Sequence, residues 1–213
     1  MPIIDPGIPV AINHPEYSAY TDGIEKDLFV KDITGEAYIG QVWPGPVHFP
    51  DFLHPDAQTY WTNQLAQFHD QVPYDGLWID MNEASNFCNG QKEQSCSNDT
   101  IVSGACPSPD VSNVDCCLEC ATVDDANTLD FPPYYIRSMK GSLSRHTIPV
   151  SATQYGDVAL YNSHNLYGLQ ESIATKNALL NILGKQNKRP FVLARSSFVS
   201  SGVHVNKWSG DNG

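Results

Sequence analysis

The chain has 213 residues, 41% of them hydrophobic, which is enough to bury one sizeable core. Twelve basic and 24 acidic residues give a net charge of −12, which argues against binding to nucleic acid or to anionic membranes and suits a neutral substrate such as a sugar. The sequence has no run of 18 apolar residues, so no membrane span is predicted, and its start at Met1–Pro6 has no signal-peptide pattern.

The first block, residues 1–87, alternates short apolar runs with a helical stretch. Pro2–Asp5 is typical of the end of a buried strand, and Tyr38–Val42 of a short strand that stops at Pro44-Gly45-Pro46. The run Gly76–Met81 is bounded by a turn and predicts a fully buried parallel strand.

A helix is expected after Pro55, with Asp56 near its start. Spacings of three and four put its apolar residues on one face: Trp61, Leu65, Phe68 and Val72.

The second block, residues 88–128, is polar and holds six cysteines, for which we expect three disulfides in a surface insertion. The six are Cys88, Cys96, Cys106, Cys116, Cys117 and Cys120. Six cysteines allow 15 pairings, and the sequence does not choose among them. A zinc site is the less favoured alternative, since Cys117-x-x-Cys120 has no second ligand pair and no nearby histidine. The sequon at Asn98 predicts glycosylation, which agrees with secretion.

The third block, residues 129–213, returns to the first pattern. A helix is expected over about 166–183, with Gly184 as its C-cap and an inner face of Leu169, Ile173, Leu180 and Leu183. Buried strands are expected at Arg189–Ala194 and at Val203–Trp208. Alternating helices and buried strands predict a parallel α/β architecture, but the pattern does not distinguish an open sheet from a barrel.

Two carboxylates follow different predicted strands. Asp80 interrupts an apolar strand near its end, where parallel folds build their sites, although it could instead cap the following turn. Asp211 follows the last candidate strand, although Gly210–Gly213 could be an ordinary turn. Arg195 ends a strand between them, and it could be a structural ion-pair partner. Retaining glycosidases need a pair of carboxyl groups like Asp80 and Asp211, one ionised to attack the anomeric carbon and one protonated to assist the leaving oxygen.

Several segments resemble glycoside hydrolase family 31, the α-glucosidase family, in the order in which the family has them. Trp78-Ile-Asp-Met-Asn-Glu83 resembles its nucleophile signature, and Arg195-Ser-Ser-Phe198 and Trp208-Ser-Gly-Asp-Asn212 resemble its substrate-arginine and acid/base segments. Three further blocks match as well: Gly40-Gln-Val-Trp-Pro-Gly45, Phe49-Pro-Asp-Phe52 and His164-Asn-Leu-Tyr-Gly168.

The resemblance implies a role for each matching position. It makes Asp80 the nucleophile, Asp211 the general acid/base and Arg195 a ligand of the non-reducing glucose. It implies that Asp5 also binds sugar hydroxyls, and that Glu83 supports the loop. Pocket-wall positions are Trp43, Trp78, Met81 and Trp208, with Phe87 as a further candidate.

The sequence departs from the family between Ser197 and Lys207. The family usually has Thr at Ser197, Gly at Ser200, a basic residue followed by an aromatic one at Val203–His204, and His at Lys207.

The resemblance implies that residues 1–213 are part of one catalytic (β/α)8 TIM barrel, about strands three to six, with 88–128 as a disulfide-rich insertion and the signal peptide in a missing part. The expected activity is retaining hydrolysis of terminal α-linked glucose from maltose-like oligosaccharides, with no cofactor and no metal. Alternatives are α-xylosidase, transglucosidase, glucan lyase, a non-catalytic or transporter-associated sugar-binding relative, and a small disulfide-stapled binding module at 88–120.

Overall fold

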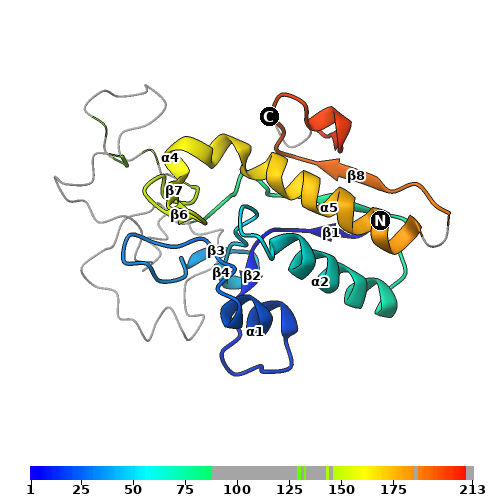
Figure 1. The fold of residues 1–213 in the computed structure, drawn as a ribbon, viewed down its shortest axis with the longest axis horizontal. Helices are drawn as coiled ribbons and strands as arrows, with labels where there is room; N and C mark the ends of the chain where they lie inside the picture. The colour runs from blue at the N-terminus through cyan, green and yellow to red at the C-terminus, as the bar shows by residue number, and fades with distance from the viewer. Residues whose placement is uncertain (88–128, 131, 133–142, 144–145, 185–186, 210–213) are drawn as a thin grey trace.

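The computed structural model describes residues 1–87, 129–130, 132, 143, 146–184 and 187–209. Its centre is a parallel sheet of four strands, shown in Figure 1. In spatial order these are β1 (Ile3–Ile4), β5 (Gly76–Ile79), β8 (Phe191–Ala194) and β9 (Asn206–Lys207). Each lies within a segment that the sequence predicted to be a strand, so the parallel α/β prediction is confirmed, although β9 is exposed and not buried as expected.

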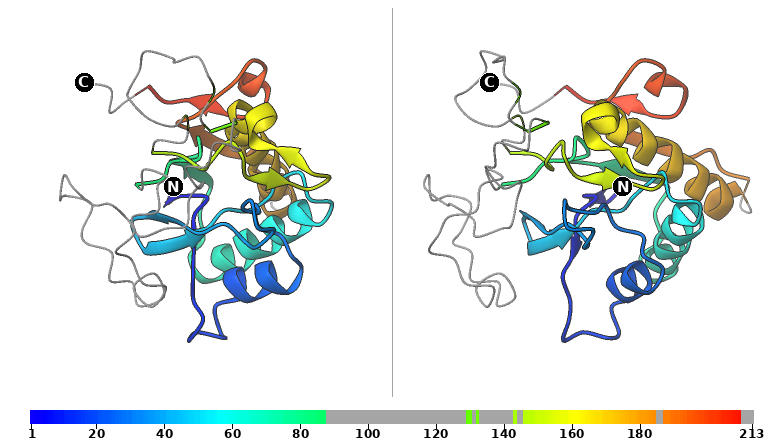
Figure 2. Two further views of the ribbon diagram at one scale, coloured as in Figure 1. Left: turned by 90° about the vertical axis from the view of Figure 1, so that its left-hand side faces the viewer. Right: turned by 60° about the vertical axis from the view of Figure 1, so that its left-hand side comes forward.

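Helices cover one face of this sheet, as both views in Figure 2 show. The two long ones, α2 (Ala57–Gln71) and α5 (Tyr167–Gly184), pack against each other and against β5 and β8. The short helix α1 (Ser18–Glu25), which the sequence reading missed, packs beside α2. The main core lies between helices and sheet and includes Leu77, Leu179 and Val192.

The strand register decides which residues enter that core. Ile4 pairs with Ile79, and Ile79 pairs with Ala194. All three pack in the core on the helical side. Because side chains alternate along a strand, the residues on either side of each of these project to the opposite face of the sheet.

A second, antiparallel sheet has the order β2 (Ile8–Pro9), β4 (Gly45–His48) and β3 (Gly40–Val42). It lies beyond the C-terminal ends of the parallel strands, next to the pair β6 (Thr153–Gln154) and β7 (Val158–Ala159), as Figure 1 shows. A second core cluster joins these parts and includes Tyr38, Phe49, Met81 and Tyr167.

The predicted strand ends at Val42, before Pro44-Gly45-Pro46, as expected, but the sequence reading missed the strand that follows. The chain only turns there, with Gly45 at φ 103°, and continues as strand β4. Pro46 takes part in the pairing through its carbonyl, which accepts a hydrogen bond from the Val10 amide at 2.9 Å, while proline has no N–H to return one.

The predicted inner face of the long helix is also wrong in part. Leu180 is 47% exposed, and Leu169 and Ile173 are only partly buried, whereas Ala174, Ala178 and Leu179 are buried against the sheet. The helix packs closely enough to α2 and the sheet that small residues, not only leucines, occupy the contact.

Short elements complete the described chain: α4 (Leu160–Ser163), η1 (His164–Leu166) and η2 (Ser201–Val203). No helix of the described residues is both long and apolar enough to cross a membrane. The predicted insertion at 88–128, with its six cysteines and Asn98, lies outside the described residues, as does Asp211.

Candidate active site

Four predicted site residues form a row along the C-terminal edge of the parallel sheet. Each directly follows a strand residue that is paired in register with its neighbour, so strand pairing alone brings them side by side. Backbone amides in this row donate to the adjacent strand: Asp80 to the Ile4 carbonyl at 2.8 Å and Trp208 to the Ala194 carbonyl at 3.0 Å. In sheet order the row reads Asp5, Asp80, Arg195 and Trp208.

Arg195 joins two carboxylates. Its Nε and Nη2 donate to Oε1 and Oε2 of Glu83 at 2.9 and 3.1 Å, and its Nη1 lies 3.4 Å from Oδ1 of Asp80. The fork-shaped hydrogen bonding with Glu83 raises the pKa of Arg195 further above its ordinary value, so the guanidinium is charged at any working pH. One cation is therefore held among several acids.

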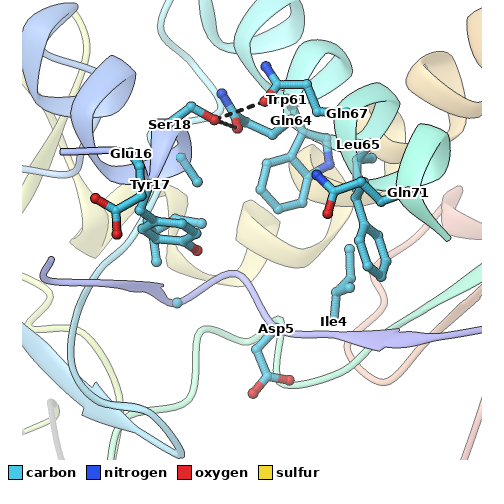
Figure 3. A pocket seen from close by; sticks show the side chains of 14 residues that line it. Ile4, Asp5, Glu16, Tyr17, Ser18, Trp61, Gln64, Leu65, Gln67 and Gln71 are labelled. Atoms are coloured by element: carbon cyan, nitrogen blue, oxygen red, sulfur yellow. Dashed lines mark hydrogen bonds between the residues drawn. The ribbon is translucent and has the colours of Figure 1, made fainter. Parts of the chain in front are cut away.

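Asp5 is the third acid of this group. Burial, followed by the negative charges of Asp80 and Glu83, raises the pKa of Asp5 to about 6, although Arg195 opposes the shift. Figure 3 shows the Asp5 carboxylate pointing away from a cavity of about 500 Å3 between β1 and helices α1 and α2, while Ile4 points into it. The alternation along β1 thus directs Asp5 to the face that carries Asp80.

The loop after β5 connects the row to helix α5. Met81 is buried with φ 84°, a left-handed conformation that costs a non-glycine residue of order 1–3 kcal/mol and is held here by the second core cluster. Beyond it, Asn82 is fully buried and its side-chain oxygen accepts the Ser196 amide at 2.7 Å. Its amide group donates to the Gly168 carbonyl at 3.4 Å, so one side chain ties the loop of Asp80 to the loop of Arg195 and to α5.

Aromatic residues form two pairs. Trp78, two residues before Asp80 on β5, and Trp208 at the end of the row meet edge to face with ring centroids 4.7 Å apart. Trp43, at the turn between β3 and β4, is 67% exposed and contacts Phe87 edge to face at 4.9 Å. Aromatic rings in a row with carboxylates suit a ligand with apolar faces and many hydroxyls, such as a sugar.

The predicted site residues therefore divide into three groups. Asp5, Asp80, Glu83, Arg195 and Trp208 lie together. Trp43 and Phe87 form a separate aromatic pair, and Met81 is 4% exposed inside the second core. Asp211 lies outside the described residues, so its distance from Asp80 remains a prediction.

Two titratable residues near the row differ in how far the sequence revealed them: Glu171 was missed, and His164 was noted only within a matching block. Glu171 on α5 is fully buried, and its carboxylate oxygens have no hydrogen-bond partner among the described residues. Burial, with the charges of Asp5 and Glu83, keeps the pKa of Glu171 well above its ordinary value. His164, expected to be structural, bonds to Thr147 at 2.5 Å. The only available signal for Glu171 was an acid inside an otherwise apolar helical repeat.

Within the described ranges, no group of three His, Cys, Asp or Glu side chains could hold a metal ion. The chemistry available at the edge is that of carboxylates, one guanidinium and aromatic rings. Such a set can bind hydroxyl groups, support a nucleophilic carboxylate and stabilise a cation-like transition state.

Comparison with known proteins agrees with this chemistry. Residues 1–213 match the family described as "Glycosyl hydrolases family 31 TIM-barrel domain". The chain is 44% identical over 213 residues to Alpha-xylosidase 1 of Arabidopsis thaliana, covering 99% of this chain and 22% of that protein. It is 37% identical over 211 residues to Lysosomal alpha-glucosidase of Rattus norvegicus, covering 99% of this chain and 19% of that protein.

A solved structure of similar fold is the ER glucosidase II heterodimeric complex of a catalytic subunit and the binding domain of a regulatory subunit. It is 26% identical, with a TM-score of 0.66 over 99% of this chain and 17% of that one. The chain thus spans about a fifth of the length of the relatives it matches.

Proposed function

The chain belongs to glycosyl hydrolase family 31, and from that membership we propose that it forms the nucleophile-bearing part of a retaining, exo-acting α-glucosidase. The substrate class is terminal, non-reducing α-linked glucose on maltose-like oligosaccharides or starch-derived glucans. The observation that carries the proposal is the row of Asp5, Asp80 and Arg195 at the C-terminal edge of three adjacent parallel strands, where barrel enzymes build their sites.

In the proposed mechanism, the Asp80 carboxylate attacks the anomeric carbon and the aglycone oxygen leaves with a proton from Asp211. Water, deprotonated by Asp211, then displaces the sugar from Asp80, so the α-configuration is kept. Asp5 and Arg195 would bind sugar hydroxyls, and Trp43 and Trp208 would line the pocket.

The contacts favour Asp80 over Glu83 as nucleophile. Both Glu83 oxygens accept hydrogen bonds from the Arg195 fork at 2.9 and 3.1 Å. Asp80 lies 3.4 Å from Nη1 of the same guanidinium and takes no part in that fork. To attack the anomeric carbon, Glu83 would first have to break its hydrogen bonds to Arg195.

A second substrate follows from a specific similarity, the 44% identity to an α-xylosidase. Xylose differs from glucose by lacking the exocyclic hydroxymethyl group, so an α-xylosidase would use the same nucleophile and acid/base. We rank the α-glucosidase first because other relatives at 37–40% identity carry that name.

The test compares both substrates in the full-length protein. Hydrolysis of 4-nitrophenyl α-glucoside and α-xyloside, followed by NMR of the first-formed sugar, reports substrate and stereochemistry together. Asp80→Ala should abolish glycosyl-enzyme formation with both. Asp211→Ala should still react with the activated aryl glucoside, and azide should rescue its turnover to give α-glucosyl azide. A first-formed β-sugar would refute the retaining mechanism.

We also propose that the protein is secreted or cell-wall associated and carries disulfides and a glycan at Asn98. The support is compositional: six cysteines and one sequon in residues 88–128. Thiol titration of the denatured, unreduced secreted protein should find no free thiol.

A further inference from the structure

A series of hydrogen bonds leads from His164 to the backbone next to Glu83. Nε2 of His164, in the turn η1, lies 2.5 Å from the Thr147 hydroxyl, and that hydroxyl donates to the Ala84 carbonyl at 2.8 Å. Ala84 follows Glu83 directly and is 1% exposed. The series of hydrogen bonds therefore ends at the backbone next to Glu83, the residue whose carboxylate holds Arg195.

The direction of each bond follows from the groups involved. A carbonyl can only accept, so the single hydrogen of the Thr147 hydroxyl goes to Ala84. Thr147 must then accept from His164, which fixes the imidazole with its hydrogen on Nε2. Burial lowers the pKa of His164, so the ring is neutral at neutral pH, which agrees with that assignment.

Backbone contacts hold Thr147, the middle residue of this series, in place. Thr147 forms an isolated antiparallel bridge with Ser85, and the Asn86 amide donates to the His146 carbonyl at 3.0 Å. The segment of Thr147 thus lies alongside the segment of Ala84 as a short ladder. Removing the hydroxyl would leave this ladder intact and would free the Ala84 carbonyl and Nε2 of His164.

We propose that Thr147 and His164 are positioning residues that fix Glu83, and through it Arg195, for substrate binding. This rests on the proposed function, because Arg195 acts there as a sugar ligand. Their effect reaches the row through the Glu83 fork.

The test is a double-mutant cycle in the full-length protein with an aryl α-glucoside. Thr147→Val keeps the side-chain shape and removes the hydroxyl, and kcat/KM should fall about tenfold, the size of one hydrogen bond. Thr147→Ser, the matched control, keeps the hydroxyl and should stay within about twofold of wild type. In a Glu83→Gln background, Thr147→Val should have no further effect.

His164→Ala makes the same test from the far end and serves if Thr147→Val does not fold. Its loss should be smaller, and it should vanish in the Thr147→Val background. Wild-type rates in Thr147→Val, or losses that multiply with Glu83→Gln, would overturn the inference and leave the proposed function standing. A wild-type protein without α-glycosidase activity would overturn both.

Discussion

Glu83 and Arg195 lie 112 residues apart in the chain and meet in a two-bond fork, with Nε–Oε1 at 2.9 Å and Nη2–Oε2 at 3.1 Å. The fork leaves Nη1 of Arg195 directed at Asp80, 3.4 Å away. Glu83 therefore orients the guanidinium of Arg195 within the row.

Glu83→Gln should weaken that arrangement, because the amide can accept from Arg195 at only one atom and carries no charge. Charge-assisted bonds are worth about 1.5–3 kcal/mol, so kcat/KM should fall roughly 10- to 150-fold, with glycosyl-enzyme formation still detectable by mass spectrometry. Glu83→Asp keeps the charge and should lose less. If Glu83→Gln formed no glycosyl-enzyme while Asp80→Asn stayed active, Glu83 and not Asp80 would be the nucleophile.

Asp5→Asn should change how stability depends on pH. The folded-state pKa of Asp5 is raised to about 6, above its unfolded value near 3.8. The stability gained from holding the proton is fully present below about pH 4 and is lost as pH rises through 6. The variant should therefore gain thermal stability relative to wild type between pH 4 and 7, while its affinity for glucose falls. An unchanged difference in melting temperature across that range would contradict the shift.

Ser200→Gly should stabilise the loop between β8 and β9. Ser200 has φ 76° and ψ −8°, a left-handed conformation, at the position where the family usually has glycine. Glycine adopts this conformation without steric cost, so the free energy of unfolding should rise by about 0.5–1 kcal/mol. Ser200→Ala keeps the Cβ and is the matched control. Equal denaturation midpoints for the two variants would show that the loop is unstrained.

Gly168→Ala should disturb the junction of α5 with the site loops. A Cβ there would lie 2.7 Å from the Asn82 carbonyl oxygen and 2.8 Å from the Ser196 side chain. Such crowding typically costs about 1–3 kcal/mol, and activity should fall as Asn82 shifts. Gly184→Ala, at the other end of the same helix, meets nothing within 4 Å and should be neutral or slightly stabilising. Urea denaturation and steady-state kinetics of both variants measure the contrast.

The apolar runs of the sequence predicted the parallel strands, because a buried strand is marked by composition alone. They could not predict the register that aligns Asp5, Asp80 and Arg195, since strand pairing depends on residues far apart in the chain. The antiparallel sheet was missed for a related reason: β2 and β4 are short and contain Pro9 and Pro46, which normally argue against a strand.

The candidate site shows the same division. Resemblance supplied the residue roles, but the fork between Glu83 and Arg195 and the buried acid Glu171 became visible only in three dimensions. Helical periodicity assigned the inner face of α5 to large apolar residues, whereas the close packing of the helix selects Ala174 and Ala178 and also buries Glu171.

The register of the parallel strands also constrains the order in which the protein can fold. The chain emerges from the ribosome with three acids of the cluster, Asp5, Asp80 and Glu83, long before their shared cation. Until β8 pairs with β5, no folding intermediate can bring Arg195 to them, and contacts of such high sequence separation form slowly. Closure of the β5–β8 pair is thus expected to be a late step that both extends the sheet and brings the acids their shared cation.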